Sequence, residues 1–349
     1  MAYTTINDPA LYFQTKTYSG SNSDLSVTFD GENDMQPDLV WLKKTGGTGD
    51  HLIYDAVRGV NKRLQPNATD SEVDRSGNND ELKAFNSDGW TLGTFNSNVT
   101  GAGSTNVSWN WKESADAGFD IVSFTGSGDG TASTAKTVSH SLSAVPRWIM
   151  IKNRADSTNW GVYHGANTDN PETEIIYLNL SNATSDDNGF WNDTAPTSSV
   201  FTVGGDNGIN GNSDAMIAYC WAPKQGYSKF GKYVGNGNAN GTFVYTGFRP
   251  AFVLIKRTTG TTEWQLIDNK RSDQGGGFGN VIDEVIAPST DDASYDEGTA
   301  GSWFADFYAT GFKLRGAWAA GNVDGQTYIY CAFAESPTVN SNGVPTNAR

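Results

Sequence analysis

Short apolar stretches of roughly four to six residues recur along the whole chain and are separated by polar turns. Turn signals such as Ser-Gly-Asn-Asn, Asp-Asn-Gly and Gly-Asn-Gly divide them at intervals of roughly 8–12 residues, a spacing typical of an antiparallel sandwich or barrel. No long segment has a convincing helical period, and the best helical candidate, 280–287, is short. The pattern therefore predicts an all-β fold.

Three segments of the chain align without gaps, at 37–55, 146–164 and 250–268. Each begins with a proline, continues with five mostly apolar residues and reaches a lysine, at positions 43, 152 and 256. A polar turn and a second short apolar stretch follow in all three. Such self-similarity at a fixed period is the sequence signature of internal repeats.

Further blocks recur in the same order. The segments 88–92, 199–203 and 310–314 lie 111 residues apart, and related segments at 107–114, 217–224 and 329–336 close each copy. We therefore predict three tandem repeats of about 105–110 residues. The predicted domains are an N-terminal segment (1–15), three β-sandwich repeats (16–114, 121–224, 230–336) and an extended C-terminal arm (337–349).

The repeats are long enough to form antiparallel β-sandwiches of a jelly-roll or lectin-like kind, each with its own core. The runs 39–42, 148–151 and 252–255 are apolar throughout, which predicts strands covered on both faces. By contrast, Val107, Trp109 and Trp111 alternate with Ser108 and Asn110. Because the linkers are short, we expect rigid packing. A pseudo-threefold ring and a linear array both remain open.

The charge and the cysteine content narrow the classes of binding partner and the compartment in which the protein is made. The 349 residues include 24 Lys plus Arg and 39 Asp plus Glu, a net charge of −15. This charge argues against binding nucleic acid or anionic lipid through a basic face. The sequence has no signal-peptide pattern and no apolar run approaching the roughly 20 residues that span a bilayer. Cys220 and Cys331 are expected to be buried thiols, which fits synthesis in a reducing cytosol.

Aromatic residues separate into matched and unmatched positions. The matched ones are predicted to be core residues, since they recur in all three repeats: Trp111, Trp221 and Phe333, and Trp90, Phe201 and Phe312. The unmatched Trp191, Trp303 and Trp318 lie in polar surroundings. They are candidates for contact with a partner or a sugar, although packing under loops is the commoner role of such residues.

Candidate catalytic and metal-binding residues are sparse. His51, His140 and His164 are far apart, and no zinc, metalloprotease or serine-hydrolase motif occurs. The nearest acidic pairs are Asp186-Asp187, Asp291-Asp292, Asp296-Glu297 and Glu172-x-Glu174. Glycoside hydrolysis needs two carboxylates across one bond, and loop acids are usually solvated. We predict no enzyme activity, no cofactor and no metal.

Two other polar patterns have simple structural explanations. The Asp/Asn/Gly loops Asp129-Gly130, Asp206-Asn207-Gly208 and Asp324-Gly325 lack known calcium-loop spacing, and we interpret them as turns. The basic islands Arg58, Lys62-Arg63 and Lys270-Arg271 are expected on a solvated face, with pairing to acidic loops of another subunit as the alternative. The binding residues stay unknown.

The segments PDLVWLKK…HLIYDAVRG and RPAFVLIKR, with the ending YCAFAESP…VNSNGVPTNAR, resemble a family of virion structural proteins of marine tailed bacteriophages. Members are described as tail-fibre-like or lectin-like sandwich proteins. The resemblance covers nearly the whole chain and implies a location on the virion, outside the cell after synthesis in the host cytoplasm. It implies no catalytic residues.

These observations predict a non-enzymatic virion structural protein, exposed in a tail fibre, a tail tip or a head decoration. Its expected partners are other virion proteins, copies of itself with a trimer favoured, and a host surface glycan as a further candidate. Two alternatives stay open, a receptor-binding lectin-like adhesin and a polysaccharide depolymerase.

Overall fold

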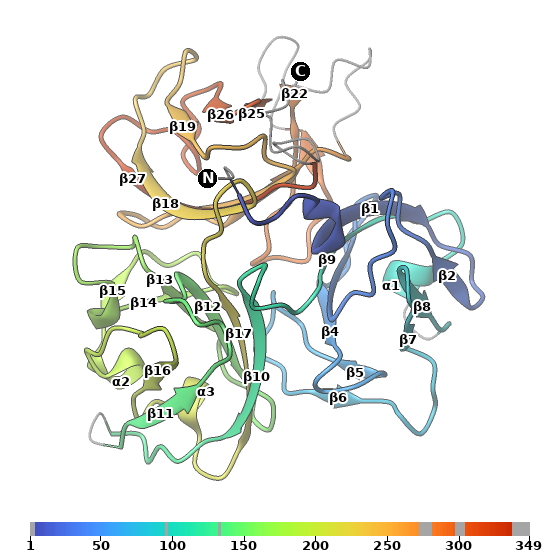
Figure 1. Cartoon of the computed structure of the whole chain (residues 1–349), viewed down its shortest axis with the longest axis horizontal. Coiled ribbons are helices and arrows are strands. Elements are labelled where there is room, and N and C mark those ends of the chain that lie inside the picture. Colours follow the sequence, from blue (N-terminus) through green and yellow to red (C-terminus); the bar gives the residue numbers. More distant parts are fainter. Residues whose placement is uncertain (1–3, 95–96, 132–133, 272–280, 297–303, 337–349) are drawn as a thin grey trace.

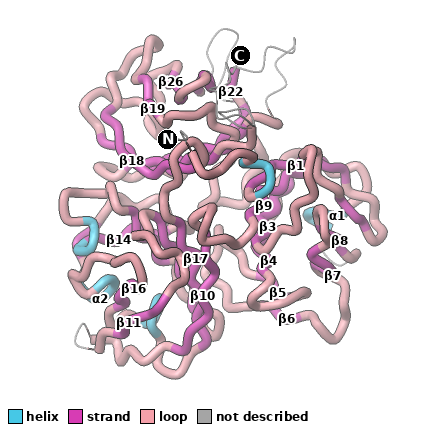
Figure 2. Tube along the Cα trace, in the orientation of Figure 1, coloured by secondary structure: helices cyan, strands magenta, loops and turns pink. Residues whose placement is uncertain are grey.

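The structure is a computed structural model that describes residues 4–94, 97–131, 134–271, 281–296 and 304–336. Strands dominate it, and the described helices are single turns (Figure 2): η1 Pro9–Leu11, α1 Ser97–Thr100, η2 Pro171–Thr173, α2 Asn188–Trp191 and α3 Asn207–Asn210. The predicted all-β class is confirmed. The predicted arm 337–349 lies outside the described residues.

The prediction of a short helix at 280–287 is wrong. Val281–Ile282 forms β22 and Glu284–Val285 forms β23. β22 pairs with β25 and β23 pairs with β24, so two neighbouring strand pairs satisfy the backbone groups that a helix would have paired locally.

Three four-strand arrangements share one order, in which the strand that comes last in the chain lies between the two that come first (Figure 1). We call the parts of the chain that build them the first, second and third units, and these sheets the inner sheets. In the first unit the inner sheet comprises β1 (Phe13–Ser19), β9 (Thr105–Trp111), β3 (Leu39–Lys44) and β4 (Leu52–Asp55).

The inner sheets of the other two units repeat this order. In the second unit they are β10 (Phe119–Thr125), β17 (Ala215–Trp221), β12 (Trp148–Asn153) and β13 (Gly161–His164), extended by β14 (Glu174–Tyr177) and β15 (Ser185–Asp186). In the third unit they are β18 (Ser228–Val234), β27 (Thr327–Phe333), β20 (Phe252–Arg257) and β21 (Gln265–Asp268). The first strands begin two or three residues before the predicted repeat starts.

A smaller outer sheet covers one face of each inner sheet. The outer sheets are β2 (Leu25–Val27), β8 (Trp90–Leu92) and β7 (Leu82–Phe85); β11 (Lys136–Ser139) and β16 (Val200–Val203); and β19 (Phe243–Tyr245), β26 (Gly311–Leu314), β25 (Ala305–Tyr308) and β22. Two further pairs are β5 (Lys62–Arg63) with β6 (Val73–Asp74), and β23 with β24 (Tyr295–Asp296). Each unit thus encloses a separate apolar cluster between its sheets.

The other faces of the three inner sheets meet at the centre of the molecule. There they form a fourth apolar cluster, which we call the axial core and to which all three units contribute. Trp111, Trp221 and Phe333 are equivalent residues of the closing strands and contact one another, with ring centroids 5.6–6.5 Å apart. The matched aromatics predicted as core residues are all buried. Burying both faces of each inner sheet also explains the continuous apolar runs.

The expectation of three separately closed sandwiches therefore needs correction. An inner sheet closed only on its own outer sheet would expose Trp109, Trp111 and their equivalents to water, a large apolar area. Packing about a common centre removes that area. Figure 1 shows the three units as lobes around this centre, with the third unit adjoining both the second and the first.

Candidate binding site

Of the unmatched tryptophans, Trp191 and Trp318 fall within the described residues, and neither is fully exposed. Trp191 is buried, and its ring packs edge-on against Tyr163 at 5.5 Å. Trp318 is half-buried against the core of the third unit. Trp303 lies outside the described residues. The contact role considered for Trp191 is wrong, because one turn of helix α2 places its side chain under the outer face of the second unit.

Two of the three histidines are buried between units. His51 Nδ1 accepts from Trp41 Nε1 at 2.9 Å, so Nε2 carries the proton toward the carbonyl of Ala287 in the third unit. His164 likewise accepts from the amide of Ala166 and donates to the carbonyl of Tyr330, at 3.1 Å. Burial lowers the pKa of His164 to about 4. Both rings therefore act as neutral connectors of units.

The Asp/Asn/Gly loops form turns and helix caps in the described structure, and Asp187 of the first acidic pair also caps a helix. Asp187 and Asp206 cap α2 and α3, each accepting from a glycine amide two residues on. Asp129 accepts from the amide and hydroxyl of Thr131 and from the hydroxyl of Thr134, which holds its pKa near 2. Gly130 and Gly325 have positive φ, as their turns require.

No group of three or more His, Cys, Asp or Glu within the described ranges is placed to hold a metal ion. Of the predicted acidic pairs, Asp186 lies exposed on β15 while Asp187 caps a helix, and Glu297 falls outside the described residues. Cys220 and Cys331 are free and buried in different clusters, as predicted.

The solvated face expected for the basic islands is wrong for two arginines. Arg58 is buried and pairs with Asp55 through its Nε and with Glu72 through its NH1. Arg271 occupies the equivalent place in the third unit and pairs with Asp268 at 2.6 Å. These pairs form inside one chain, because the turn after β4 and β21 brings the arginine back over the aspartate three residues earlier.

The aspartates also connect units. Asp55 accepts from the hydroxyl of Tyr219 in the second unit at 2.6 Å, and Asp268 accepts from Trp109 Nε1 in the first unit at 3.1 Å. His164, the equivalent residue of the second unit, reaches the third unit. Hydrogen bonds from one equivalent position, Asp55, His164 and Asp268, therefore join the first unit to the second, the second to the third and the third to the first, which closes the chain into a ring.

We call the contact between the first and second units the first seam, between the second and third the second seam, and between the third and first the third seam. One backbone hydrogen bond recurs in all of them: Glu72 N to Arg154 O (2.9 Å), Thr184 N to Thr258 O (3.0 Å) and Ser294 N to Thr45 O (3.0 Å). The accepting carbonyl in each case belongs to the residue that directly follows β3, β12 or β20. The seams thus share a backbone frame and differ in side chains.

The lysines that mark the repeat are buried near these seams. Lys43, Lys152 and Lys256 each donate from Nζ to a backbone carbonyl, at 2.7–2.9 Å. For Lys256 this carbonyl belongs to Ser181 of the second unit. Burial lowers the pKa of each lysine to about 8. The lysine recurs for a structural reason, because in each unit its ammonium group donates hydrogen bonds to backbone carbonyl groups.

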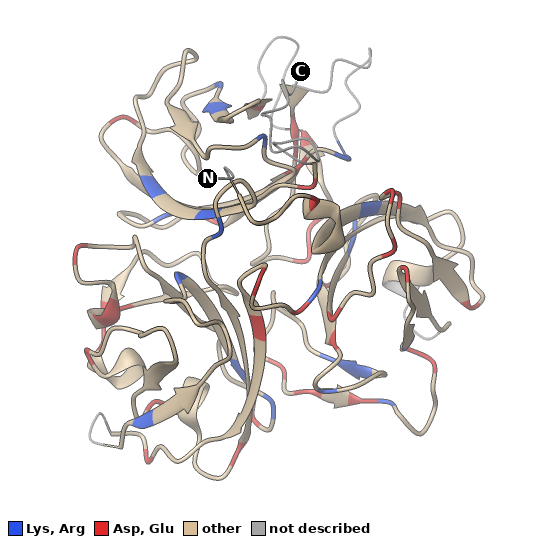
Figure 3. Cartoon of the chain, viewed as in Figure 1, with Lys and Arg blue, Asp and Glu red and all other residues tan. Residues whose placement is uncertain are grey.

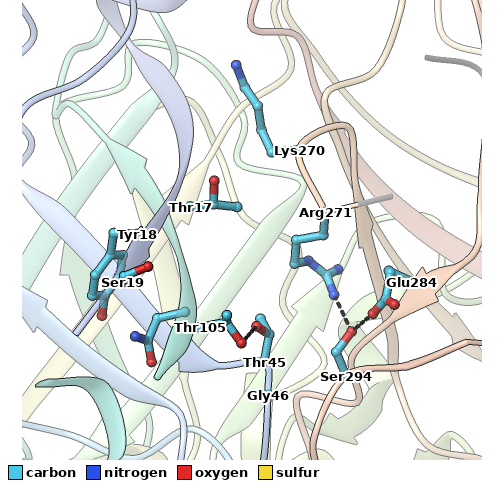
Figure 4. Close-up of a pocket in the computed structure, with 11 residues that line it drawn as sticks. Thr17, Tyr18, Ser19, Thr45, Gly46, Thr105, Lys270, Arg271, Glu284 and Ser294 are labelled. Carbon is cyan, nitrogen blue, oxygen red and sulfur yellow. Dashed lines mark hydrogen bonds between the residues drawn. The ribbon is translucent and has the colours of Figure 1, made fainter. Parts of the chain in front are cut away.

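The third seam contains a cleft of about 510 Å³, drawn in Figure 4, which we call the seam cleft. The first unit lines it with β1, β9 and the turn after β3, and the third unit with the turn after β21, with β23 and with Ser294 just before β24. Its lining residues are Thr17, Tyr18, Ser19, Thr45, Gly46, Thr105, Asn106, Lys270, Arg271, Glu284 and Ser294. Tyr18 packs its ring against Trp90 inside the first sandwich.

Hydrogen bonds fix the two walls of the seam cleft (Figure 4). On the third-unit side, Arg271 NH1 donates to Ser294 Oγ at 3.1 Å, and Ser294 in turn donates to Glu284. On the first-unit side, the hydroxyls of Thr45 and Thr105 bond at 3.1 Å. A Cβ on Gly46 would come within 2.4 Å of the Thr105 hydroxyl, so a larger residue there would displace it.

A second surface feature distinguishes the third unit. Phe243 and Tyr245 flank buried Val244 on the edge strand β19 and are 45% and 56% exposed. The β19 register aligns Phe243 with Ser26 and Thr137 of the other units, and Tyr245 with Ser139 of the second unit. We call them the aromatic pair. The sequence analysis did not identify these two residues. A comparison of the three copies could have found them, because they are aromatic at positions where the other copies have hydroxyl side chains.

A small pocket of about 290 Å³ adjoins the aromatic pair. It is lined by the turn 223–226 between the second and third units, by Lys229 and by 245–247. Lys229 Nζ donates to the carbonyl of Tyr245 at 2.6 Å and lies 5.1 Å from the centre of its ring. The pocket therefore places an exposed aromatic ring beside a cation, and exposed aromatic side chains are good contact residues.

The fold and its surface features define a ring-like all-β protein with a polar cleft and an exposed aromatic pair. The chain belongs to a family described as a domain of unknown function, DUF7483, whose model matches residues 8–337 and so includes all three units. A search of curated proteins found no match. Among the described residues, no helix has the length and apolar character needed to cross a membrane.

Proposed function

We propose that the protein is a non-enzymatic structural component of a bacteriophage particle, exposed as part of a tail fibre, a tail tip or a head decoration. The observation that supports this proposal is the closed ring of three like units. One chain places three related sets of loops around one approximate axis, and each seam is held by the same backbone bond. Such a chain matches a threefold or sixfold position on a particle.

The energetics of the ring also suit a particle component. The axial core joins the three units through buried aromatics, so no unit can leave the ring without exposing large apolar side chains. Acidic residues lie in all three units (Figure 3), and the chain as a whole carries a net charge of −15. A net charge of this size opposes aggregation at the high local density of a particle surface.

The test is to locate the chain. Antibodies against the recombinant protein are applied to purified particles of the encoding phage, and the particle density is compared with the three-lobed ring. We expect labelling at one structural position and one ring, or three rings, per symmetry axis. Absence of the chain from purified particles, by mass spectrometry, overturns the proposal. The same measurement decides whether the predicted trimer forms.

A second candidate function, receptor binding, is favoured by the aromatic pair. Exposed aromatic side chains that the fold does not need are good contact residues. A glycan array with the wild-type protein and the double variant Phe243→Thr with Tyr245→Ser tests it, because these residues copy the second unit. We expect binding that the double variant loses with unchanged melting temperature. An array signal equal in both proteins removes this candidate.

A further inference from the structure

The three seams differ at equivalent positions, although their backbones agree. The first seam joins Arg58, Glu72 and Arg154; the second joins Asn167, Thr184 and Thr258; the third joins Arg271, Ser294 and Thr45. Arg154 donates to both carboxylate oxygens of Glu72, from Nε at 2.9 Å and from NH2 at 2.8 Å, and so fills the first seam. The short side chains of Thr45 and Ser294 leave the third seam open.

The charged groups of the seam cleft already have partners within the chain. Arg271 pairs with Asp268, and Lys270 lies 3.5 Å from Glu335. In Figure 4 the Lys270 side chain extends away from the row formed by Arg271, Ser294 and Glu284. A negatively charged ligand would meet the carboxylate of Glu284 without gaining an unpaired cation in exchange. The cleft is therefore matched to a ligand without net charge.

The remaining polar groups are mainly hydroxyls, and their chemistry narrows the ligand. Thr17, Ser19, Thr45, Thr105 and Ser294 contribute five of them. A hydroxyl both donates and accepts, so a row of hydroxyls matches a ligand that carries hydroxyls at several adjacent carbons. The volume of about 510 Å³ lies within the range of about 300–1,000 Å³ usual for small-molecule sites. Apolar ligands find few apolar side chains here.

We propose that the seam cleft binds a short uncharged oligosaccharide segment. The open third seam positions the hydroxyls of β1, β9 and the turn after β3 opposite Arg271, Ser294 and Glu284, and a saccharide between them bonds to both units. This inference concerns a ligand and does not depend on a location on the virion. It also differs from the receptor-binding candidate, which uses the aromatic pair.

The first seam supplies the design of the test variant. The double substitution Thr45→Arg with Ser294→Glu copies Arg154 and Glu72 into the third seam. Arg271, which now donates to Ser294, would then pair with the new glutamate as Arg58 pairs with Glu72. It fills the cleft with an ion pair that the fold already accommodates elsewhere. The matched control is Thr137→Arg with Ser139→Glu, which makes the same two kinds of substitution at exposed positions of β11 in the second unit, outside both the cleft and the aromatic pair.

The experiment measures binding to an array of neutral hexose and N-acetylhexosamine oligosaccharides, with uronic-acid and sulfated oligosaccharides on the same array, followed by calorimetry with the strongest ligand. We expect the wild type and the control to bind a neutral oligosaccharide and the filled variant to bind at least tenfold more weakly, with its melting temperature retained. No binding to neutral oligosaccharides, preference for the acidic ones, or binding retained by the filled variant overturns the proposal.

Discussion

In the first seam, Arg154 crosses to Glu72 and beside it Arg58 is fully buried, whereas in the third seam Thr45 takes the place of Arg154 and a cleft opens beside Arg271. The backbone bond is the same in both seams. The difference shows that the frame of the ring does not need the side chains that fill the first seam. Sequence change at these positions is therefore available for function.

The largest expected effect comes from the buried ion pairs. Asp55→Ala leaves Arg58 buried without its carboxylate and removes the acceptor of the Tyr219 hydroxyl, so we expect a loss of about 3–5 kcal/mol in the free energy of unfolding. Asp268→Ala should lower the free energy of unfolding by less than Asp55→Ala does, because Arg271 lines the seam cleft and water there can reach it. Urea denaturation of both variants measures the difference. Equal losses would show that the cleft does not hydrate Arg271.

The second seam should respond to acid through His164, and the third seam through His51, whose pKa burial also lowers well below its usual value. The pKa of His164 is lowered to about 4, so the unfolded chain takes up the proton first, and stability falls as the pH decreases from 6.5 toward 4. We expect up to about 3 kcal/mol from this group. His164→Asn, which keeps an acceptor for the Ala166 amide, should flatten the decline.

The matched control for this experiment is His140→Gln, since His140 lies outside the seams and is half-buried. Chemical denaturation at several pH values gives the slope for each protein. An unchanged slope in His164→Asn would mean that other groups control acid unfolding.

The pair that fills the first seam should contribute an intermediate amount. Glu72→Ser, Arg154→Thr and the double variant form a double-mutant cycle, and we expect a coupling of about 1–2 kcal/mol for this partly buried pair. The double variant copies the third seam into the first. A coupling near zero would mean that the first seam gains nothing from being closed.

The smallest expected effect lies at the connection between the first and second units. Burial and the neighbouring Asp120 raise the pKa of Glu113 to about 7, so the folded state holds this proton more tightly than the unfolded state. Stability from this group is full below pH 4.5 and is lost as the pH rises through 7.

Because Glu113 is half-exposed, we expect only about 1 kcal/mol. Glu113→Gln should raise the unfolding free energy at pH 8 and leave it nearly unchanged at pH 4.5, whereas the exposed Glu32→Gln should alter neither. Thermal melts at the two pH values distinguish them. A lower melting temperature of Glu113→Gln at pH 8 would contradict the assignment.

Local pattern was sufficient for several features of the fold. The apolar runs 39–42, 148–151 and 252–255 are buried strands, and the matched aromatics are core residues, because burial on both faces and core packing leave a direct trace in residue type. The helix considered for 280–287 failed, since short mixed segments carry no distinguishing period. Trp191 failed as a contact residue because polar neighbours do not report whether a ring points inward.

The candidate sites were less accessible to sequence reasoning. Thr45 and Arg154 stand at aligned positions, but the alignment does not say that both face a neighbouring unit across a seam. The aromatic pair could have been found by comparing the copies for aromatics that replace hydroxyls. Arg58 and Arg271 were expected in solvent because a basic island has the same composition whether it is exposed or paired with a buried aspartate.

The sequence by itself determined the all-β class, the order of the recurring blocks, and the burial of the apolar runs and matched aromatics, because alternation and apolar runs are local consequences of burial. The tertiary structure alone decided that the units close into a ring, that their inner sheets share an axial core, and that the third seam contains a cleft. Those outcomes depend on side chains more than 100 residues apart meeting across an interface, as Trp109 and Asp268 do, and no local pattern encodes that meeting.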